Sequence, residues 1–177
     1  MIETILQADK AVLEYIQTLH SDFLNVFMPA VTSLGDAGVF WLTWATLLCF
    51  FPKTRKTGIL MVAALSVTFV VSTLGLKNLF ERLRPCAQFP KEFFFICPSG
   101  FSFPSGHSIS SFAAAGVLFF RHEKGGLVAL ILAAMIAFSR TYLYVHFPLD
   151  ILIGSLLGVG SAYLIVRCCG TQKKAEP

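Results

Sequence analysis

Two basic residues near the end of an apolar stretch are spaced so that they can bind one anion together. Lys77 and Arg84 are seven residues apart, about two helical turns, so a helix would place them on one face. Arg offers a planar pair of N–H donors to a phosphate, and Lys adds a compact positive charge. Pro85 is expected to end this helix. For such a pair alone, the commoner explanation is two anchors reaching the lipid headgroups.

The second motif is Pro104-Ser105-Gly106-His107, directly before another apolar stretch. Pro and Ser are typical of a helix start, where free N–H groups attract an anion. Gly106 would let the backbone approach a phosphate oxygen closely. His107 would lie where an imidazole can protonate a leaving oxygen. The alternative is an ordinary helix cap with an interfacial histidine.

The third motif ends one apolar stretch and begins the next. Ser139-Arg140 is followed after five residues by His146, and Asp150 comes four residues later. A spacing of four lets the carboxylate of Asp150 meet the imidazole of His146. A carboxylate on one ring nitrogen fixes the tautomer and leaves the other nitrogen free to attack, as in a catalytic triad. The alternative, a capped helix start with an incidental histidine, is disfavoured by the presence of the other two motifs.

These histidines do not predict a zinc site. His107 and His146 lack closely spaced partner ligands, and the sequence contains neither an H-E-x-x-H nor a C-x-x-C pattern. The neighbouring cations Lys77, Arg84 and Arg140 suit an anion and repel a divalent cation. We therefore expect neither a metal nor another cofactor.

The elements that must position these residues are apolar helices. Hydrophobic residues make up 55% of the 177 residues and charged residues only 14%, whereas a soluble domain carries about 25% charge. The sequence therefore predicts an all-α, polytopic transmembrane helix bundle, organised as a single domain over residues 1–177. A crossing needs about 20 residues, so the apolar segment at 23–34 is either a short sixth span, lengthened by the preceding helix, or a re-entrant segment. Five other stretches are predicted spans: 39–51, 57–80, 108–120, 126–143 and 149–167.

Residues 1–20 combine apolar and polar positions at helical spacing. This pattern predicts an amphipathic helix, lying either at the membrane surface or packed on the bundle. A secretory signal is not expected, because Glu3, Asp9, Lys10 and Glu14 interrupt the apolar positions.

Basic residues gather in connections that five or six spans would place on one side of the membrane. These connections are 53–56, 121–124 and the C-terminal segment from Arg167. Positively charged loops face the cytoplasm, so the three motifs are expected on the opposite side, which is periplasmic in a bacterium. We therefore expect a multi-pass protein of the bacterial cytoplasmic (inner) membrane.

In order and spacing, the three motifs resemble the signature of the type 2 phosphatidic acid phosphatase superfamily, which comprises lipid phosphate phosphatases related to vanadium haloperoxidases. The likeness spans residues 77–150 with no departure at a motif position. It implies that His146 is a nucleophile forming a phosphohistidine, that Asp150 orients it, and that His107 protonates the departing lipid oxygen and then activates water. It also implies that the phosphoryl oxygens are bound by Lys77, Arg84, Ser105, Gly106 and Arg140.

The resemblance implies a metal-independent phosphatase whose partners are the bilayer and a phosphorylated lipid. Candidate substrates are undecaprenyl pyrophosphate, phosphatidylglycerol phosphate, phosphatidic acid and the 1-phosphate of lipid A. We expect selectivity to lie in residues 1–38 and 86–103. The net charge of +4 is too small to indicate nucleic acid, and no obligate protein partner is evident.

Two other classes of protein share such a scaffold. A lipid-phosphate binding or transport protein would not need an oriented nucleophile, so the complete set of His107, His146 and Asp150 disfavours it. A haloperoxidase would hold vanadate in the same anion pocket, but haloperoxidases of this kind are soluble.

Three further features accompany the motifs. Cys86 and Cys97 fall in one outer loop, where disulfides form, so we expect a bridge that stiffens the loop. Asp36 is expected near the same face as a partner for a basic residue. Arg82 lies about 140° round the expected helix from Lys77, which suggests packing or headgroup contacts. Neither Asp36 nor Arg82 is expected to be catalytic.

Overall fold

The computed structural model describes residues 2–89 and 95–169. Every regular element in these ranges is a helix, which confirms the all-α prediction for the described part of the chain. In order these are α1 (Ile2–Gln17), α2 (Asp22–Ser33), η1 (Asp36–Gly38), α3 (Val39–Phe50), α4 (Arg55–Phe69), η2 (Val70–Leu76), α5 (Lys77–Phe80), α6 (Pro85–Gln88), α7 (Gly106–Phe120), α8 (Gly126–Tyr142) and α9 (Pro148–Cys169).

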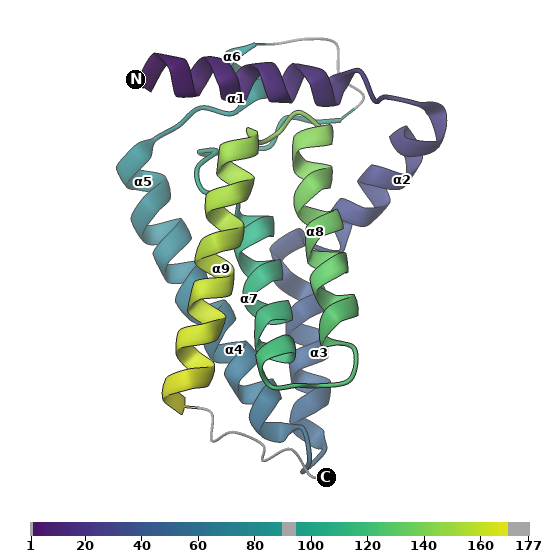
Figure 1. The fold of residues 1–177 in the computed structure, drawn as a ribbon, viewed down its shortest axis with the longest axis vertical. Helices are drawn as coiled ribbons and strands as arrows, with labels where there is room; N and C mark the ends of the chain where they lie inside the picture. The colour runs from purple at the N-terminus through teal and green to yellow at the C-terminus, as the bar shows by residue number, and fades with distance from the viewer. Residues whose placement is uncertain (1, 90–94, 170–177) are drawn as a thin grey trace.

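The longer helices run alongside one another, and α1 lies across one end of the bundle they form (Figure 1). From α1 the chain descends through α2 and α3, returns through α4, η2 and α5, descends through α7, ascends through α8 and descends through α9. The start of α7, the end of α8 and the start of α9 therefore all lie at the end covered by α1. This topology gathers the three sequence motifs at one end of the bundle.

The apolar segment expected at 23–34 is followed directly by a second helix that continues in the same general direction. It forms α2, which meets the η1–α3 segment at a bend of 41°, and both run in the same direction away from α1 (Figure 1). The break has a local cause, because Ala37 and Gly38 adopt left-handed backbone angles, with φ of 50° and 67°. Residues 22–33 thus form, together with the following helix, either one broken span or a re-entrant segment.

The predicted number of spans is not established by helix length. Within the described residues, two helical stretches are long and apolar enough to cross a membrane, Arg55–Gln88 and Pro148–Cys169, and the bent α2–α3 pair makes a third if it counts as one span. Helices α7 and α8 are apolar but shorter than a crossing normally needs.

Helix α7 forms the centre of the bundle, where it contacts α4, α8 and α9. Small residues allow its close approach to α9, since a Cβ added at Gly158 would lie 2.5 Å from the backbone oxygen of Ile109. The same two helices are joined at their first turns, where the Ser105 N–H donates to the backbone oxygen of Asp150 at 3.1 Å. The second and third motifs are therefore fixed relative to each other by backbone contacts.

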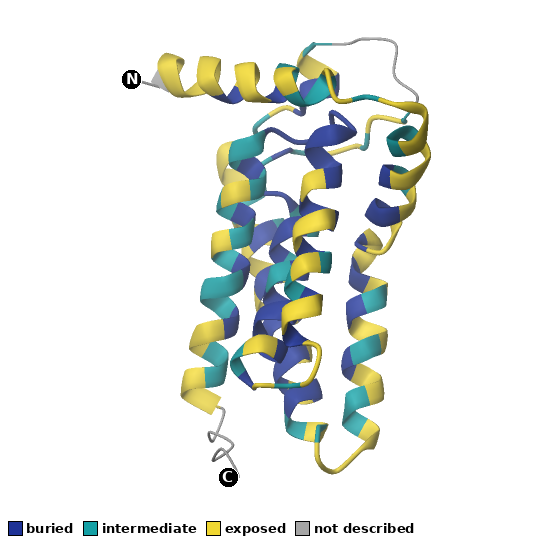
Figure 2. Ribbon diagram, turned by 45° about the vertical axis from the view of Figure 1, so that its right-hand side comes forward, coloured by how far each residue is buried: buried dark blue, intermediate teal, exposed yellow. Residues whose placement is uncertain are grey.

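The outward faces of the bundle expose apolar side chains, and Figure 2 shows exposed positions along the outer sides of the helices. Examples on four different helices are Phe50, Leu79, Leu127 and Leu156. Exposed apolar side chains on many helices are typical of a surface that contacts a membrane or another protein. Hydrocarbon is the environment that suits a bundle whose core and surface are both apolar.

Helix α1 packs on the bundle, one of the two alternatives that its sequence pattern allows. Leu13 is fully buried and Asp9 is only 6% exposed. Towards the N-terminus of the same helix, Ile5 and Leu6 remain about half exposed, at 48% and 47%, although they lie on the same face as Asp9 and Leu13. The helix is thus docked through its second half and leaves apolar side chains exposed in its first half.

Candidate active site

His146 lies in the short connection between α8 and α9 and is 2% exposed. Its Nδ1 faces Oδ2 of Asp150 at 3.5 Å, and its Nε2 accepts a hydrogen bond from Nη1 of Arg84 at 2.9 Å. A carboxylate beside Nδ1 keeps the ring proton on that nitrogen, so the lone pair resides on Nε2. The geometry therefore presents Nε2 to whatever anion Arg84 binds.

The surroundings of His146 keep its imidazole neutral. Burial lowers the pKa of His146 to about 3; the hydrogen bond to Asp150 acts in the opposite direction, and the charges of Arg84 and Arg140 lower the pKa further. An unperturbed histidine has a pKa of about 6.5. The Nε2 lone pair thus remains available at pH values where an exposed histidine would be protonated.

Ser102 is a member of this group that sequence reasoning missed. Its fully buried hydroxyl donates a hydrogen bond to Oδ2 of Asp150 and lies 3.3 Å from Nδ1 of His146. The Phe147 N–H also donates to Oδ2, at 2.9 Å. Ser102 stands two residues before Pro104, outside the spacing used to define the motif. The carboxylate of Asp150 is therefore held from several directions.

Arg84 is held by backbone carbonyl groups as well as by His146. Its Nε donates to the Gly100 oxygen at 3.1 Å, and its Nη1 donates to the Val145 oxygen at 3.1 Å. The expected disulfide is present, joining Cys86 to Cys97 with their Cα atoms 5.8 Å apart. This bridge closes the outer loop just before Gly100, so it supports the segment on which the guanidinium rests. Residues 90–94 of the same loop, part of the segment expected to set selectivity, lie outside the described residues.

Arg140 supplies a second guanidinium, from the last turn of α8. Its Nη1 donates to Oγ1 of Thr32 at 2.8 Å, but its buried Nε has no hydrogen-bond partner among the described residues. A buried N–H without an acceptor is costly, and an anion oxygen would satisfy it. Half-buried Lys77 lies close enough to Arg84 and Arg140 for their charges to interact. Three cations from separate segments thus converge.

A turn, not one helix face, brings Lys77 and Arg84 together, so the helix predicted to carry both was wrong. Helix α5 ends at Phe80, and Glu81 adopts a left-handed conformation with φ of 44°. Arg84 is extended, and Pro85 begins α6 rather than ending a helix. The residue before a proline favours an extended backbone, and proline suits the first position of a helix.

The second motif forms the first turn of α7. Ser105 caps the helix, its Oγ accepting from the N–H and the hydroxyl of Ser108 at 3.3 Å and 3.0 Å. Gly106 is the first helical residue, and a Cβ built there would meet nothing within 4 Å. The backbone at Gly106 therefore borders open space at the positive end of a helix, where an anion is favoured. The Ser105 oxygen serves the helix cap, so any contact with phosphate would use its own hydrogen.

His107 lies beside these groups and pairs with an acidic residue from another segment. Its Nε2 is 2.9 Å from Oδ1 of Asp36 in η1. The charges of Arg84 and Arg140 also reach the His107 ring. Asp36 was expected to contact a basic residue, and its partner is this histidine. The Asp36 carboxylate can hold the orientation of the His107 ring, so the imidazole is kept beside the start of α7.

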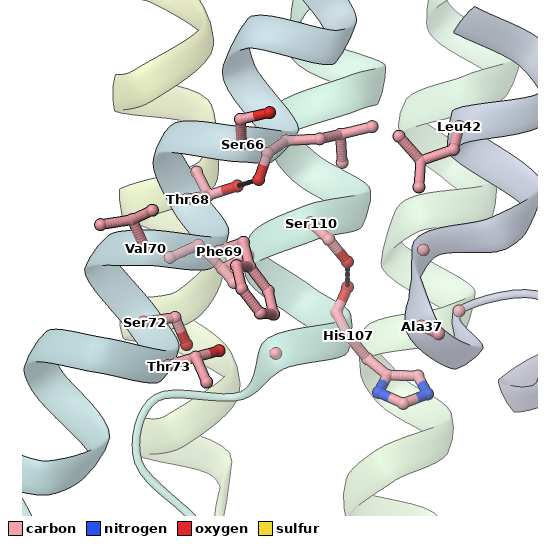
Figure 3. Close-up of a pocket in the computed structure, with 15 residues that line it drawn as sticks. Ala37, Leu42, Ser66, Thr68, Phe69, Val70, Ser72, Thr73, His107 and Ser110 are labelled. Atoms are coloured by element: carbon pink, nitrogen blue, oxygen red, sulfur yellow. Dashed lines mark hydrogen bonds between the residues drawn. The ribbon is translucent and has the colours of Figure 1, made fainter. Parts of the chain in front are cut away.

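An apolar cleft of about 560 Å³ opens beside His107. Helices α3, α4 and α7 and the π-helical segment η2 contribute its walls, which include Leu42, Leu65 and Phe69 (Figure 3). Gly106 also belongs to the lining, and apart from His107 no lining side chain is ionisable. A lipid could therefore lie with its hydrocarbon in the cleft and its headgroup at the start of α7.

Gly35 makes the room that the His107 ring occupies. A Cβ built at Gly35 would overlap Cδ2 of the His107 ring and lie 2.8 Å from Cγ2 of Ile136. We expect Gly35→Ala to displace the ring and lower kcat about 100-fold, because a misplacement of about 1 Å can cost that much. The measurement is phosphate release from a lipid phosphate by the purified variant.

The matched control is Gly160→Ala in α9, where an added Cβ would meet nothing within 4 Å. This control should turn over like the wild type. Equal activity of both variants would show that the position of the His107 ring does not limit the reaction.

Two other findings complete the description of the site. Arg82, expected to serve packing or headgroups, contacts Asp150, with Nη1 2.7 Å from Oδ1. Among residues 2–89 and 95–169 there is no group of three or more His, Cys, Asp or Glu side chains that could hold a metal ion.

Comparison with known proteins identifies the family. The profile of the PAP2 superfamily matches residues 56–174, which include all three motifs. The chain belongs to the PAP2 superfamily. This PAP2 protein is 32% identical to an undecaprenyl-diphosphatase of Sulfolobus acidocaldarius over 158 residues, covering 86% of this chain and 75% of the relative.

Solved structures share the architecture. The PAP2-type phosphatidylglycerolphosphate phosphatase of Bacillus subtilis superposes with a TM-score of 0.80 at 27% identity, covering 98% of this chain and 90% of the other. LpxE of Aquifex aeolicus gives a TM-score of 0.78 at 26% identity, covering 89% of this PAP2 protein and 93% of that chain. The bundle is therefore that of transmembrane PAP2 phosphatases.

Proposed function

We propose that this PAP2 protein is a membrane lipid phosphatase, which removes phosphate from a lipid phosphomonoester or pyrophosphate through a phosphohistidine. The observation that carries the proposal is the placement of His146, whose Nε2 faces Arg84 while its Nδ1 faces Asp150. Binding alone does not require an imidazole whose tautomer is fixed and whose Nε2 lone pair points toward the phosphate-binding guanidinium. This feature therefore favours hydrolysis over the binding or transport alternative.

The first chemical step transfers the phosphoryl group to His146. Its Nε2 forms a bond to phosphorus as the bond from phosphorus to the lipid oxygen breaks, and protonated His107 gives its proton to that oxygen. Arg84, Arg140 and Lys77 neutralise the developing charge on the phosphoryl oxygens. These three cations do the work that metal ions do in kinases and other phosphoryl-transfer enzymes.

The second step releases phosphate. Neutral His107 takes a proton from a water molecule, whose oxygen attacks phosphorus as the bond from phosphorus to Nε2 breaks. Asp150 stabilises the positive charge that His146 carries while phosphorylated. Inorganic phosphate then leaves and both histidines return to their starting states.

The bundle is proposed to cross the membrane with five segments, namely α2–α3, α4–α5, α7, α8 and α9. Basic residues of the α3–α4 and α7–α8 connections, Lys53 and Lys124, and Lys56 in the first turn of α4, lie at the end opposite to the site. Arg167, in the last turn of α9, lies at that end as well. Positive loops favour the cytoplasm, so the site is assigned to the periplasmic or outer leaflet of a bacterial inner membrane.

The substrate is proposed to place its phosphate near His146 and the first part of its hydrocarbon in the cleft beside His107. Undecaprenyl pyrophosphate, phosphatidylglycerol phosphate, phosphatidic acid and lipid A 1-phosphate all satisfy this description. Two of these agree with the names of the compared relatives, an undecaprenyl-diphosphatase and a phosphatidylglycerolphosphate phosphatase.

A panel of these four lipids in detergent tests the proposal. We expect the purified protein to release phosphate from at least one of them at the same rate with and without EDTA, because the cations of the site are side chains. Vanadate, which resembles the five-coordinate state of phosphorus, should inhibit. Loss of activity in EDTA that returns with added metal would contradict the mechanism, and absence of release from every lipid would contradict the function.

A further inference from the structure

Arg82 links the candidate catalytic carboxylate to the N-terminal helix. It lies in the turn between α5 and α6, where its Nη1 donates to Oδ1 of Asp150 at 2.7 Å and its Nη2 donates to Oδ2 of Asp9 at 2.6 Å. The guanidinium carbon Cζ also lies over the ring of Phe147, 4.0 Å from its centroid. The Arg82 side chain is 15% exposed, and those of Asp9 and Asp150 are 4% and 0% exposed.

Asp9 is fixed from a second direction. Its Oδ1 accepts from the Leu149 N–H at 2.8 Å, so a residue of α1 satisfies a free N–H in the first turn of α9. That turn carries Asp150 itself. The carboxylate of Asp9 therefore joins α1 to the start of α9 and at the same time holds the guanidinium of Arg82.

The two oxygens of Asp150 have different partners. Oδ2 accepts from Ser102 and from the Phe147 N–H, and it faces Nδ1 of His146. Oδ1 accepts from Nη1 of Arg82. Removing this guanidinium would leave a buried carboxylate oxygen without its strong donor, so the carboxylate plane could rotate away from His146.

We propose that Arg82 is a positioning residue for the Asp150–His146 pair and that Asp9 is its anchor on α1. This inference rests on the proposed function, since it concerns the same nucleophile. Arg82 differs from Arg140 in a way that separates positioning from phosphate binding. Both amino groups of Arg82 are occupied by carboxylates, whereas Arg140 has a buried N–H without a partner.

The inference is tested with Arg82→Gln and Arg82→Lys. We expect Arg82→Gln to lower kcat about 100-fold, as expected for a nucleophile that is out of line, with KM and the vanadate inhibition constant within threefold of wild type. Arg82→Lys, which keeps the positive charge and one donor nitrogen, should recover at least tenfold of that loss. Asp9→Asn should lower kcat by less than Arg82→Gln, because Arg82 still reaches Asp150.

A double-mutant cycle separates an effect through Asp150 from a general loss of structure. Phosphohistidine formation in Asp150→Asn/Arg82→Gln should be no more than threefold slower than in Asp150→Asn alone, because residues in one network are not additive. If the double variant instead loses the product of the two single losses in rate, Arg82 acts independently of Asp150, and the proposal is overturned. If Arg82→Gln does not purify as a folded protein, Arg82→Lys and Asp9→Asn carry the same comparison.

Two exposed residues provide control variants in which the same types of side chain, an arginine and a carboxylate, are replaced outside the site. Arg167→Gln removes an arginine from the far end of α9, and Glu3→Gln removes a carboxylate from α1; both should turn over like wild type. Unchanged kcat in Arg82→Gln, or a KM and vanadate constant that rise with the loss of kcat, would overturn the positioning role. Absence of wild-type turnover would overturn the proposed function and this inference with it, so the two failures are distinguishable.

Discussion

Replacing His146 by Asn is expected to lower lipid phosphate turnover by about 10⁴-fold or more, because removal of a nucleophile that forms a covalent intermediate ends that route. The other groups would still bind phosphate, since Arg84 and Arg140 are held largely by Gly100, Val145 and Thr32. The variant should therefore retain binding of the lipid while losing its hydrolysis. The measurement is the rate of phosphate release by the variant, compared with the rate of the wild type with and without vanadate.

The control for this prediction is His122→Asn. His122 is an exposed histidine at the opposite end of α7, with a positive φ of 53° that Asn tolerates well. It should turn over like wild type. Turnover of the His146 variant within tenfold of this control would place the nucleophile elsewhere.

Replacing His107 by Asn is expected to have an effect that depends on the leaving group. For a lipid phosphomonoester, whose alkoxide leaves poorly, loss of the general acid should lower the rate of phosphoryl transfer about 10³-fold. For an aryl phosphate, whose phenolate leaves without a proton, the same variant should phosphorylate His146 almost as fast as wild type. The second step still needs His107 to activate water, so the phosphorylated protein should accumulate.

Rapid mixing of the His107 variant with an activated aryl phosphate measures this directly. A burst of phenol equal to the amount of protein, followed by slow turnover, is the expected result, and wild type and His122→Asn should show faster steady turnover. Equal losses for lipid and aryl substrates, with no burst, would mean that His107 binds phosphate rather than transferring protons. The contact with Asp36 holds the ring in one orientation, which proton transfer requires.

The polar residues of the site were predictable because ionisable side chains are rare in apolar, membrane-spanning sequence. Lys77, His107, Arg140 and Asp150 interrupt or border apolar segments, and charge at membrane depth is costly unless it is used. The structure brings these four segments to one end of the bundle. Their chemical roles remain proposals, which the experiments above test.

Other members of the site carried no such signal. Ser102 is one of many serines, and its burial against Asp150 depends on a loop that only tertiary packing defines. Gly35 stands in a stretch that could be identified as a turn, but the overlap of its Cβ with His107 involves residues 72 positions apart. Arg82 was not expected to be catalytic, because a helix continuing through Arg84 would turn it away from Lys77. The helix in fact ends before Glu81, whose left-handed conformation changes the direction of the chain.

The fold was predictable in its class and less so in its details. Apolar composition and helical spacing were sufficient to indicate helices, because period and composition are local properties. The junction of α2 and α3 was not predictable from them, since a bend and a turn back across the membrane use the same Gly-containing sequence. The docking of α1 depends on Asp9 meeting Leu149 and Arg82, which lie far away in the chain.

The most direct test of the account is the capture of the covalent intermediate. Wild-type protein mixed with a phosphate-labelled lipid substrate and quenched within one turnover should carry acid-labile, alkali-stable phosphate, and peptide mass spectrometry should locate it on the imidazole of His146. The label should be absent from His146→Asn. Turnover without any labelled protein, or a label on another side chain, would contradict attack by Nε2 of His146.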